Sequence, residues 1–127
     1  MTMKTIRRRL KRFSAMHKLP GVSKSHKCHN EHGHNYIVWV EVCGPVDEKT
    51  GFIIDTAIID SVWVPLHSML DHQEGGLNAV AGLENPTTEI LSEWIHERFA
   101  RALADFEFAW IQVTVCESDD SEATCIT

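Results

Sequence analysis

The chain has 127 residues, of which 43% are hydrophobic and 24% are charged, and its net charge is -6. This length and composition predict one globular domain over residues 1–127 with a single core, and they exclude a disordered chain. No apolar run approaches the roughly 18 residues that a membrane span needs, so we expect no membrane partner.

Positive charge is concentrated at the start of the chain. Residues 1–27 hold nine of the twelve Lys and Arg residues and no acidic residue, whereas residues 28–127 hold all eighteen acids. The run Arg7-Arg8-Arg9 is typical of a transit peptide or of a nucleic-acid-binding arm. Because it continues directly into Phe13 and the pattern beyond it, we interpret it as the first strand of the domain.

The four cysteines are too few and too widely spaced for a disulfide scaffold. Without the apolar segment of a secretory signal, we expect reduced thiols in a cytoplasmic protein. The cysteines are Cys28, Cys43, Cys116 and Cys125. The last three fall in or near expected strands, where a structural role is the simplest interpretation.

Alternating and β-branched residues predict strands, and apolar residues three or four apart predict helices. In chain order we expect a strand (5–17), a polar loop (18–31), a strand (34–43), a helix (58–70), a Gly-rich loop (73–86), a helix (from about 86 to 103) and two strands (109–117 and 122–127). This order predicts an α+β fold in which helices cover one face of an antiparallel sheet.

Proline and capping rules add two details to the helices. Pro65 lies inside the first helical pattern and should kink or split that helix. Asn85, Pro86 and Thr87 predict the start of the second helix, with Asn85 as the cap and Pro86 at the first helical position.

A pair of histidines leads the clearest strand of the sequence. His32 and His34 are two residues apart and therefore point to the same face of the strand. His17 ends the first strand, and if the two strands pair it can meet the other two histidines. Three imidazoles suit Zn²⁺ and leave a fourth position open for water or substrate, as in catalytic sites. Spacing alone leaves open that the three histidines are unrelated.

The remaining histidines include two on the expected helices and two in the loop. His67 and His96 are on the helices, where we expect solvated or capping roles rather than metal binding. His26 and His29 flank Cys28, and together with Lys27 they favour its thiolate form. Such a thiolate is either a fourth metal ligand or a general base; an inert loop cysteine is the alternative.

Two carboxylates complete the candidate site. Asp71 and His72 follow the first helix, and in a loop the carboxylate can orient the imidazole for proton transfer, although a surface pair is the simpler local interpretation. Glu117 ends an apolar strand face, where a carboxylate is costly to bury without donors. The amino-pyrimidinone edge of a pterin or guanine offers two such donors. A solvated Glu117 beyond the sheet edge remains the alternative.

Several short segments together resemble the 6-pyruvoyl-tetrahydropterin synthase and 6-carboxy-tetrahydropterin synthase family, which has the tunnelling fold. The matching segments run from Phe13 to about Cys125 and have a specific joint order. They are Phe13–Pro20, His26–Cys28, His32–Tyr36, Thr50–Asp55, Leu70–His72, Leu83–Glu89 and Val115–Glu117.

The resemblance implies a four-stranded antiparallel sheet with two helices on one face, closed into a barrel by a homo-oligomer, usually a hexamer. It implies zinc on His17, His32 and His34. Other implied roles are proton abstraction by Cys28, a proton relay by Asp71 and His72, and pterin binding by Glu117 with Thr87 and Thr88. The family's substrate is dihydroneopterin triphosphate, and Lys24 and Lys27 are the nearest candidates to receive its triphosphate.

The spacing between Cys28 and His32 resembles one branch of this family. Three residues separate them, as in the carboxy-forming enzymes of queuosine and 7-deazaguanine biosynthesis, whereas the animal pyruvoyl-forming enzymes usually have a longer gap. The segment Leu83–Thr88 also resembles the carboxy branch. The segment Gln73–Ala79 departs from the more compact family pattern, and the Arg7–Arg9 run is not a family hallmark.

Three alternative functions predict different experimental results. A pyruvoyl-forming synthase would not release acetaldehyde. A zinc hydrolase would use the open three-histidine site but would have no need of Cys28 or Glu117. A nucleic-acid-binding module would show salt-dependent binding, although the sequence has no reader motif. The resemblance favours a pterin synthase of the carboxy-forming branch over all three alternatives. We therefore expect no nucleic-acid partner.

Overall fold

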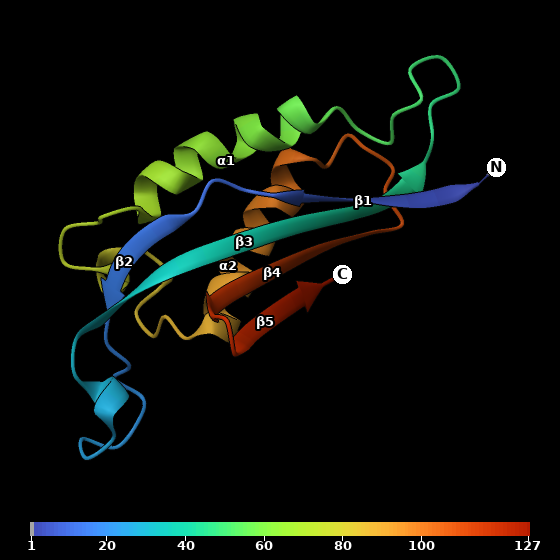
Figure 1. Ribbon diagram of the computed structural model, residues 1–127. Coiled ribbons are helices and arrows are strands. Elements are labelled where there is room, and N and C mark those ends of the chain that lie inside the picture. Colours follow the sequence, from blue (N-terminus) through green and yellow to red (C-terminus); the bar gives the residue numbers. More distant parts are fainter. Residues whose placement is uncertain (1) are drawn as a thin grey trace.

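The computed structural model describes residues 2–127. Its elements are β1 (Met3–Arg9), β2 (Phe13–His17), the short 3₁₀ helix η1 (Lys27–His29), β3 (His32–Pro45), α1 (Thr56–Leu70), a second 3₁₀ helix η2 (Leu77–Ala79), α2 (Thr88–Ala102), β4 (Trp110–Ser118) and β5 (Ser121–Ile126). All strand pairs are antiparallel, and α1 and α2 cover one face of the sheet (Figure 1). The predicted α+β architecture is confirmed.

The long strand β3 organises the sheet. Its second half pairs with β1, with Arg9 opposite Trp39, and its first half pairs with β2, with Phe13 opposite Tyr36. On its other side β3 pairs with β4, which in turn pairs with β5. The single strand expected over residues 5–17 is therefore two strands that share one partner.

The break between β1 and β2 determines which side chains face the helices. From Arg9 to Phe13 the chain advances four residues, whereas the partner strand advances only three, from Trp39 to Tyr36. One extra residue reverses the alternation of side chains, as in a β-bulge. Phe13 and His17 therefore face the helices, while Arg9 faces the opposite side of the sheet.

Side chains of α1 satisfy the backbone carbonyls at this break. Trp63 donates its indole N–H to the carbonyl of Lys11 at 2.8 Å, and His67 Nε2 lies 2.9 Å from the carbonyl of Arg12. His67 is thus half-buried and bonded to the neighbouring connection. The solvated or capping role expected for His67 was wrong, because the sequence does not reveal these unpaired carbonyls.

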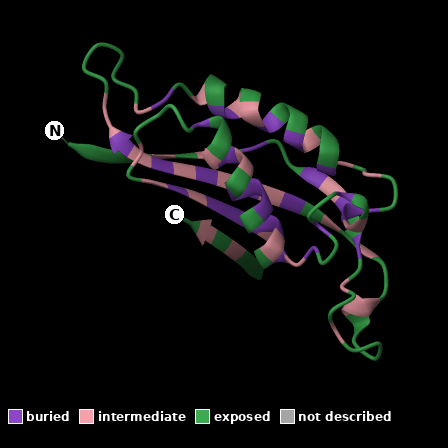
Figure 2. Ribbon diagram, turned by 180° about the vertical axis from the view of Figure 1, so that it is seen from behind, coloured by how far each residue is buried: buried purple, intermediate pink, exposed green. Residues whose placement is uncertain are grey.

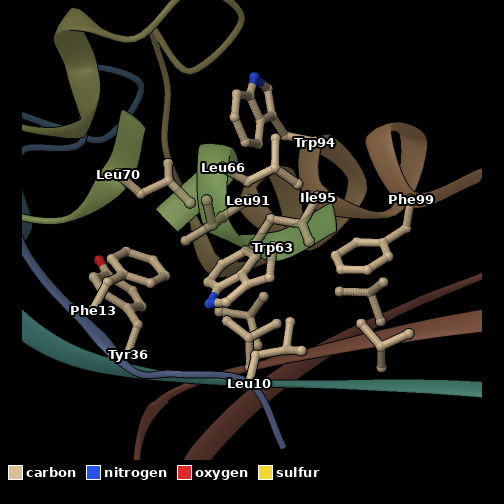
Figure 3. Packing of buried hydrophobic residues seen from close by; sticks show 14 of the residues in the cluster. Leu10, Phe13, Tyr36, Trp63, Leu66, Leu70, Leu91, Trp94, Ile95 and Phe99 are labelled. Carbon is tan, nitrogen blue, oxygen red and sulfur yellow. The ribbon is translucent and has the colours of Figure 1, made fainter. Parts of the chain in front are cut away.

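Aromatic rings fill the core between the sheet and the helices. Trp63 packs between Phe13 and Phe99, with ring centroids 6.1 and 6.5 Å away, and Phe13 stacks on Tyr36 at 4.8 Å (Figure 3). Buried and half-buried residues alternate along β3, as expected for a strand with one covered face (Figure 2).

The structure decides part of the first helix expectation and corrects the second. Pro65 does not split α1, which runs from Thr56 to Leu70 with Pro65 on its exposed side. Thr87, not Asn85, caps α2, and its Oγ1 accepts a hydrogen bond from the amide of Ile90. The amide of Thr87 itself donates to the carbonyl of Asn85, so Asn85 belongs to the turn before the helix.

The basic run at the start of the chain is tied to the same molecule. The Arg7 guanidinium lies 4.0 Å from the centroid of the Trp39 ring, and Arg8 forms an ion pair of 2.6 Å with Asp60 of α1. The hydrogen bonds and positive charge of Arg8 lower the pKa of Asp60 below its ordinary value. These contacts support the interpretation of the run as a strand of the domain.

Across residues 2–127, no helix combines the length and the apolar character needed to cross a membrane.

We expect Trp63→Phe to lower the free energy of unfolding by about 1–2 kcal/mol, because it leaves the Lys11 carbonyl without its buried donor. Urea denaturation would measure the change. Trp110→Phe is the matched control, since within residues 2–127 the Trp110 indole makes no hydrogen bond. Equal losses in the two variants would show that the hydrogen bond at the break contributes nothing.

Candidate active site

Three histidines converge where β2 ends and β3 begins. His17 stands directly opposite His32 in the strand register, and His34 lies opposite Ala15. Their ring centroids are 4.5 to 5.0 Å apart, and one nitrogen from each ring lies within 4.8 Å of the others. The strand pairing and alternation expected from the sequence therefore bring these residues together.

The protonation of two of these rings is set by backbone carbonyls. His17 Nδ1 lies 2.9 Å from the carbonyl of Pro86, and His32 Nδ1 lies 2.7 Å from the carbonyl of Asn30. A carbonyl oxygen only accepts, so each Nδ1 carries the proton. In the neutral rings the Nε2 atoms are then bare, and they face each other at 3.0 Å. Two opposed lone pairs at that distance repel each other unless a shared proton or a metal ion lies between them, so the donor set fits a metal ion.

His34 supplies a third nitrogen without a hydrogen bond. Its Nε2 is buried and unpaired, although it lies 3.2 Å from Glu117 Oε1 in a geometry unsuited to a hydrogen bond. Burial is the largest cause that lowers the pKa values of both His17 and His34, which favours their neutral, metal-binding forms. His17 and His34 therefore present neutral imidazoles, and their nitrogens converge with that of His32.

Tyr36 and the turn before α2 contact the buried side of His17 in the cluster. The hydroxyl of Tyr36 lies 3.2 Å from His17 Nδ1, and the Tyr36 side chain is fully buried. Burial raises the pKa of Tyr36 far above its ordinary value, so the phenol stays protonated. The proton on His17 Nδ1 is thus held by neutral oxygen atoms on its buried side.

Glu117 lies beside the histidines at the end of the inner face of β4. Its Oε2 accepts a hydrogen bond of 2.5 Å from Thr88 Oγ1 in the first turn of α2. Its Oε1 faces His34, and the side chain is 27% exposed. Thr87 serves as the helix cap. The structure thus brings Glu117, Thr88 and the histidine cluster together and leaves the carboxylate reachable from outside.

Asp71 and His72 form a pair on the free edge of β2. Asp71 Oδ1 accepts the amide of Ser14 at 2.9 Å, and its Oδ2 lies 3.0 Å from His72 Nδ1. The hydrogen bond from Ser14 is the largest cause that lowers the pKa of Asp71, followed by His72. The His72 amide donates to the Ser14 carbonyl, and its φ of 52° turns the chain away from the helix.

An open cavity of about 430 Å³ lies along this edge. His72 lines it with Met16, Gly33 and Asn35, and His34 is the member of the histidine cluster that lines it. The His72 side chain is 77% exposed. Within residues 2–127, Asp71 and His72 make no hydrogen bond with the three histidines. The pair therefore borders the same depression without completing the site inside one chain.

The loop that carries Cys28 extends beyond the sheet (Figure 1). Cys28 lies in η1, where His26 Nδ1 accepts its amide hydrogen bond at 3.0 Å and its carbonyl accepts from Leu19. Cys28 is half-buried, whereas Lys24 and Lys27 are exposed. Among the hydrogen bonds and ion pairs of residues 2–127, none joins these three side chains to the histidine cluster.

Sequence reasoning missed part of the structure around the cluster. Tyr36 could have been predicted from the sequence, because it continues the alternation of His32 and His34 on the same strand face. The role of the Pro86 carbonyl could not, since every residue has a backbone carbonyl and no sequence pattern marks this one. The solvated or capping role expected for His96 was wrong: His96 is buried, and its Nε2 lies 3.1 Å from the carbonyl of Ile111.

Comparisons with known proteins agree with this arrangement. The sequence model of the 6-pyruvoyl tetrahydropterin synthase family matches residues 5–126. A 6-carboxy-5,6,7,8-tetrahydropterin synthase of Synechocystis sp. is 33% identical over 95 residues, which cover 71% of this chain and 70% of that protein. A 6-pyruvoyl tetrahydrobiopterin synthase of Dictyostelium discoideum is 31% identical over 98 residues, which cover 75% of this chain and 70% of that protein.

The fold comparison gives the same answer. The structure of 6-pyruvoyl tetrahydropterin synthase from Caenorhabditis elegans superposes with a TM-score of 0.84 at 25% identity, and the match covers 98% of this chain and 96% of that chain. The three relatives named above are pterin synthases. Because the family match spans nearly the whole sequence, the chain belongs to the 6-pyruvoyl tetrahydropterin synthase family.

Proposed function

We propose that the protein is a zinc-dependent 6-carboxy-tetrahydropterin synthase. It would convert 7,8-dihydroneopterin triphosphate to 6-carboxy-5,6,7,8-tetrahydropterin, with release of acetaldehyde and triphosphate, in queuosine and 7-deazaguanine biosynthesis. The reaction takes up one water, because the carboxylate holds one more oxygen than the side-chain carbon from which it forms.

One observation carries this proposal. The bare Nε2 atoms of His17 and His32 face each other beside the unpaired Nε2 of His34, and Glu117 lies next to them. Three imidazoles that leave an open position are typical of catalytic zinc sites. A carboxylate beside that position supplies an acceptor for the amino-pyrimidinone edge of a pterin. Metal and pterin would therefore share one site.

Each remaining residue has a role that follows from its chemistry. Zinc on the three histidines would supply Lewis acidity toward the side-chain hydroxyls of the substrate. Glu117, aided by Thr87 and Thr88, would hold the pterin ring. Cys28 would take a proton from a side-chain carbon, and His72, oriented by Asp71, would carry protons in the second relay.

We also propose that the enzyme is a homo-oligomer, in keeping with the hexamer usual in its family. The edge strands β1 and β5 present unpaired backbone groups to a further copy of the chain. The separation of Cys28 and of the Asp71–His72 pair from the histidines within one chain supports a site completed between subunits. Light scattering on the purified protein would give the number of subunits.

Lys24 and Lys27 are proposed to receive the triphosphate. Both are exposed on the loop that carries Cys28, where long cationic side chains can reach a flexible anion.

The pyruvoyl-forming reaction is the second candidate, because pyruvoyl synthases are about as similar to the chain as the carboxy synthase of Synechocystis is. The three-residue spacing between Cys28 and His32 favours the carboxy product.

Incubation of the protein with dihydroneopterin triphosphate would test the proposal. We expect a carboxylated tetrahydropterin and acetaldehyde, identified by mass spectrometry, and loss of both products with a chelator. A pyruvoyl product without acetaldehyde would assign the other branch. Turnover that a chelator leaves unchanged would reject the zinc-dependent mechanism.

We expect Glu117→Gln to lower kcat/KM for the pterin substrate by about 10- to 100-fold, because a charge-assisted hydrogen bond contributes roughly 1.5–3 kcal/mol. Steady-state kinetics would measure the change. Glu122→Gln makes the same substitution on the neighbouring strand β5, next to Cys116, and should leave kcat/KM near the wild-type value. Similar losses in both variants would remove Glu117 from the pterin site.

A further inference from the structure

The loop over residues 73–86 is tied to the end of β2 by one side chain. Asn78, in η2, accepts the amide of Lys18 through Oδ1 at 3.0 Å and donates through Nδ2 to the Lys18 carbonyl at 2.8 Å. The same Nδ2 lies 3.2 Å from the carbonyl of Glu84. The amide side chain thus pairs with both backbone groups of the residue that follows His17.

The far end of the same loop holds the ring of His17. Glu84 is two residues before Pro86, whose carbonyl accepts from His17 Nδ1 at 2.9 Å. Asn78 therefore connects two restraints on one histidine: the backbone just after it and the segment that leads to its hydrogen-bond acceptor. His17 is 1% exposed and packs its ring at this junction.

The approach of the loop to β2 is close throughout. Gly76 has a φ of 75°, and a Cβ on it would lie 2.6 Å from the Met16 carbonyl, so only glycine allows this contact. The loop segment that departs from the compact family pattern is thus packed directly against the last residues of β2.

We propose that Asn78 is a positioning residue for the metal site: its paired hydrogen bonds hold Lys18 and the Glu84–Pro86 segment so that His17 Nε2 points at the metal. The inference rests on the proposed function, because it assigns a metal ion to the three histidines. Partners that orient a ligating histidine through its second nitrogen commonly change metal affinity by 10- to 100-fold. Asn78 does not bond to His17 itself. It acts through its hydrogen bonds to Lys18, which follows His17, and to Glu84.

The chemistry of the side chain gives a specific substitution. Asn78→Asp keeps the shape and the acceptor for the Lys18 amide but loses both donors and sets a carboxylate oxygen against two carbonyls. Asn78→Ala removes all three hydrogen bonds. Ala81→Asp is the control, because it adds the same charge in the same loop at an exposed residue outside the Glu84–Pro86 segment.

Titration of the metal-free, full-length proteins with Co²⁺ would test the proposal through affinity and the visible absorption bands of the bound ion. We expect Asn78→Asp and Asn78→Ala to bind Co²⁺ about 10-fold or more weakly and with shifted bands, whereas Ala81→Asp matches the wild type. Circular dichroism would establish that each variant is folded, and Asn78→Asp keeps the test decisive if Asn78→Ala is unstable.

Three results would overturn the inference. Wild-type affinity and bands in both Asn78 variants would show that the Asn78 hydrogen bonds do not orient His17. The same weakening in Ala81→Asp would assign the effect to charge. Failure of the wild-type protein to bind Co²⁺ would reject the metal site itself, and with it both the proposed function and this inference.

Discussion

His32→Ala is expected to bind Zn²⁺ at least about 100-fold more weakly than the wild type, beyond the loss usual for a residue that only orients a ligand. Removing this imidazole leaves two nitrogens where catalytic zinc sites use three protein ligands. His32 suits the test because it is half-buried, whereas His17 is packed in the core. Competition with a chromophoric chelator would measure the affinity, and synthase turnover should fall with it.

His67→Ala is the matched control for this substitution. It removes a half-buried histidine whose Nε2 contacts only the Arg12 carbonyl among the hydrogen bonds of residues 2–127, so it should bind Zn²⁺ like the wild type. If His32→Ala retained full affinity, or if both variants lost it equally, the three-histidine cluster would not be the metal site.

The fold was predictable from the sequence because its elements have strong local patterns. β3 is rich in β-branched and aromatic residues, and both helices have regular apolar stripes. The break between β1 and β2 was not predictable, because it depends on Trp63 and His67 reaching carbonyls about fifty residues earlier in the chain. Of the two effects expected of Pro65, the split is absent, because α1 continues through this residue.

That break matters to the site because it places the arginines Arg7 and Arg9 of β1 and the histidine His17 of β2 on opposite faces of the sheet. Without the extra residue, His17 would share a face with Arg7 and Arg9. With it, Arg7 and Arg9 lie on one face of the sheet and the three histidines gather on the other. Arg8 lies on the helix-covered face, where Asp60 of α1 pairs with its charge. The break thus keeps Arg7 and Arg9 away from a cluster that would bind a cation.

The candidate site was predictable where side chains share one strand face, and not where backbone atoms or distant loops contribute. His32 and His34 follow from alternation, and His17 follows from the pairing of β2 with β3. The carbonyl of Pro86 and the hydrogen bonds of Asn78 come from a loop about sixty residues further along the chain. No local pattern records such contacts, since they depend on how the loop packs.

Cys28→Ala is expected to reduce turnover by about 10²-fold or more while Zn²⁺ stays bound, because a general base contributes roughly 10²- to 10⁴-fold and Cys28 is not among the three clustered ligands. Turnover with dihydroneopterin triphosphate and bound zinc would be measured on the same samples. Cys43→Ala, on the strand β3, is the control and should be fully active.

Unchanged turnover in Cys28→Ala would exclude Cys28 as the base, and loss of zinc would make it a fourth ligand instead. Retained zinc with lost turnover would separate proton abstraction from metal binding, as expected if the thiol on the loop acts on a substrate held at a metal site built on the sheet.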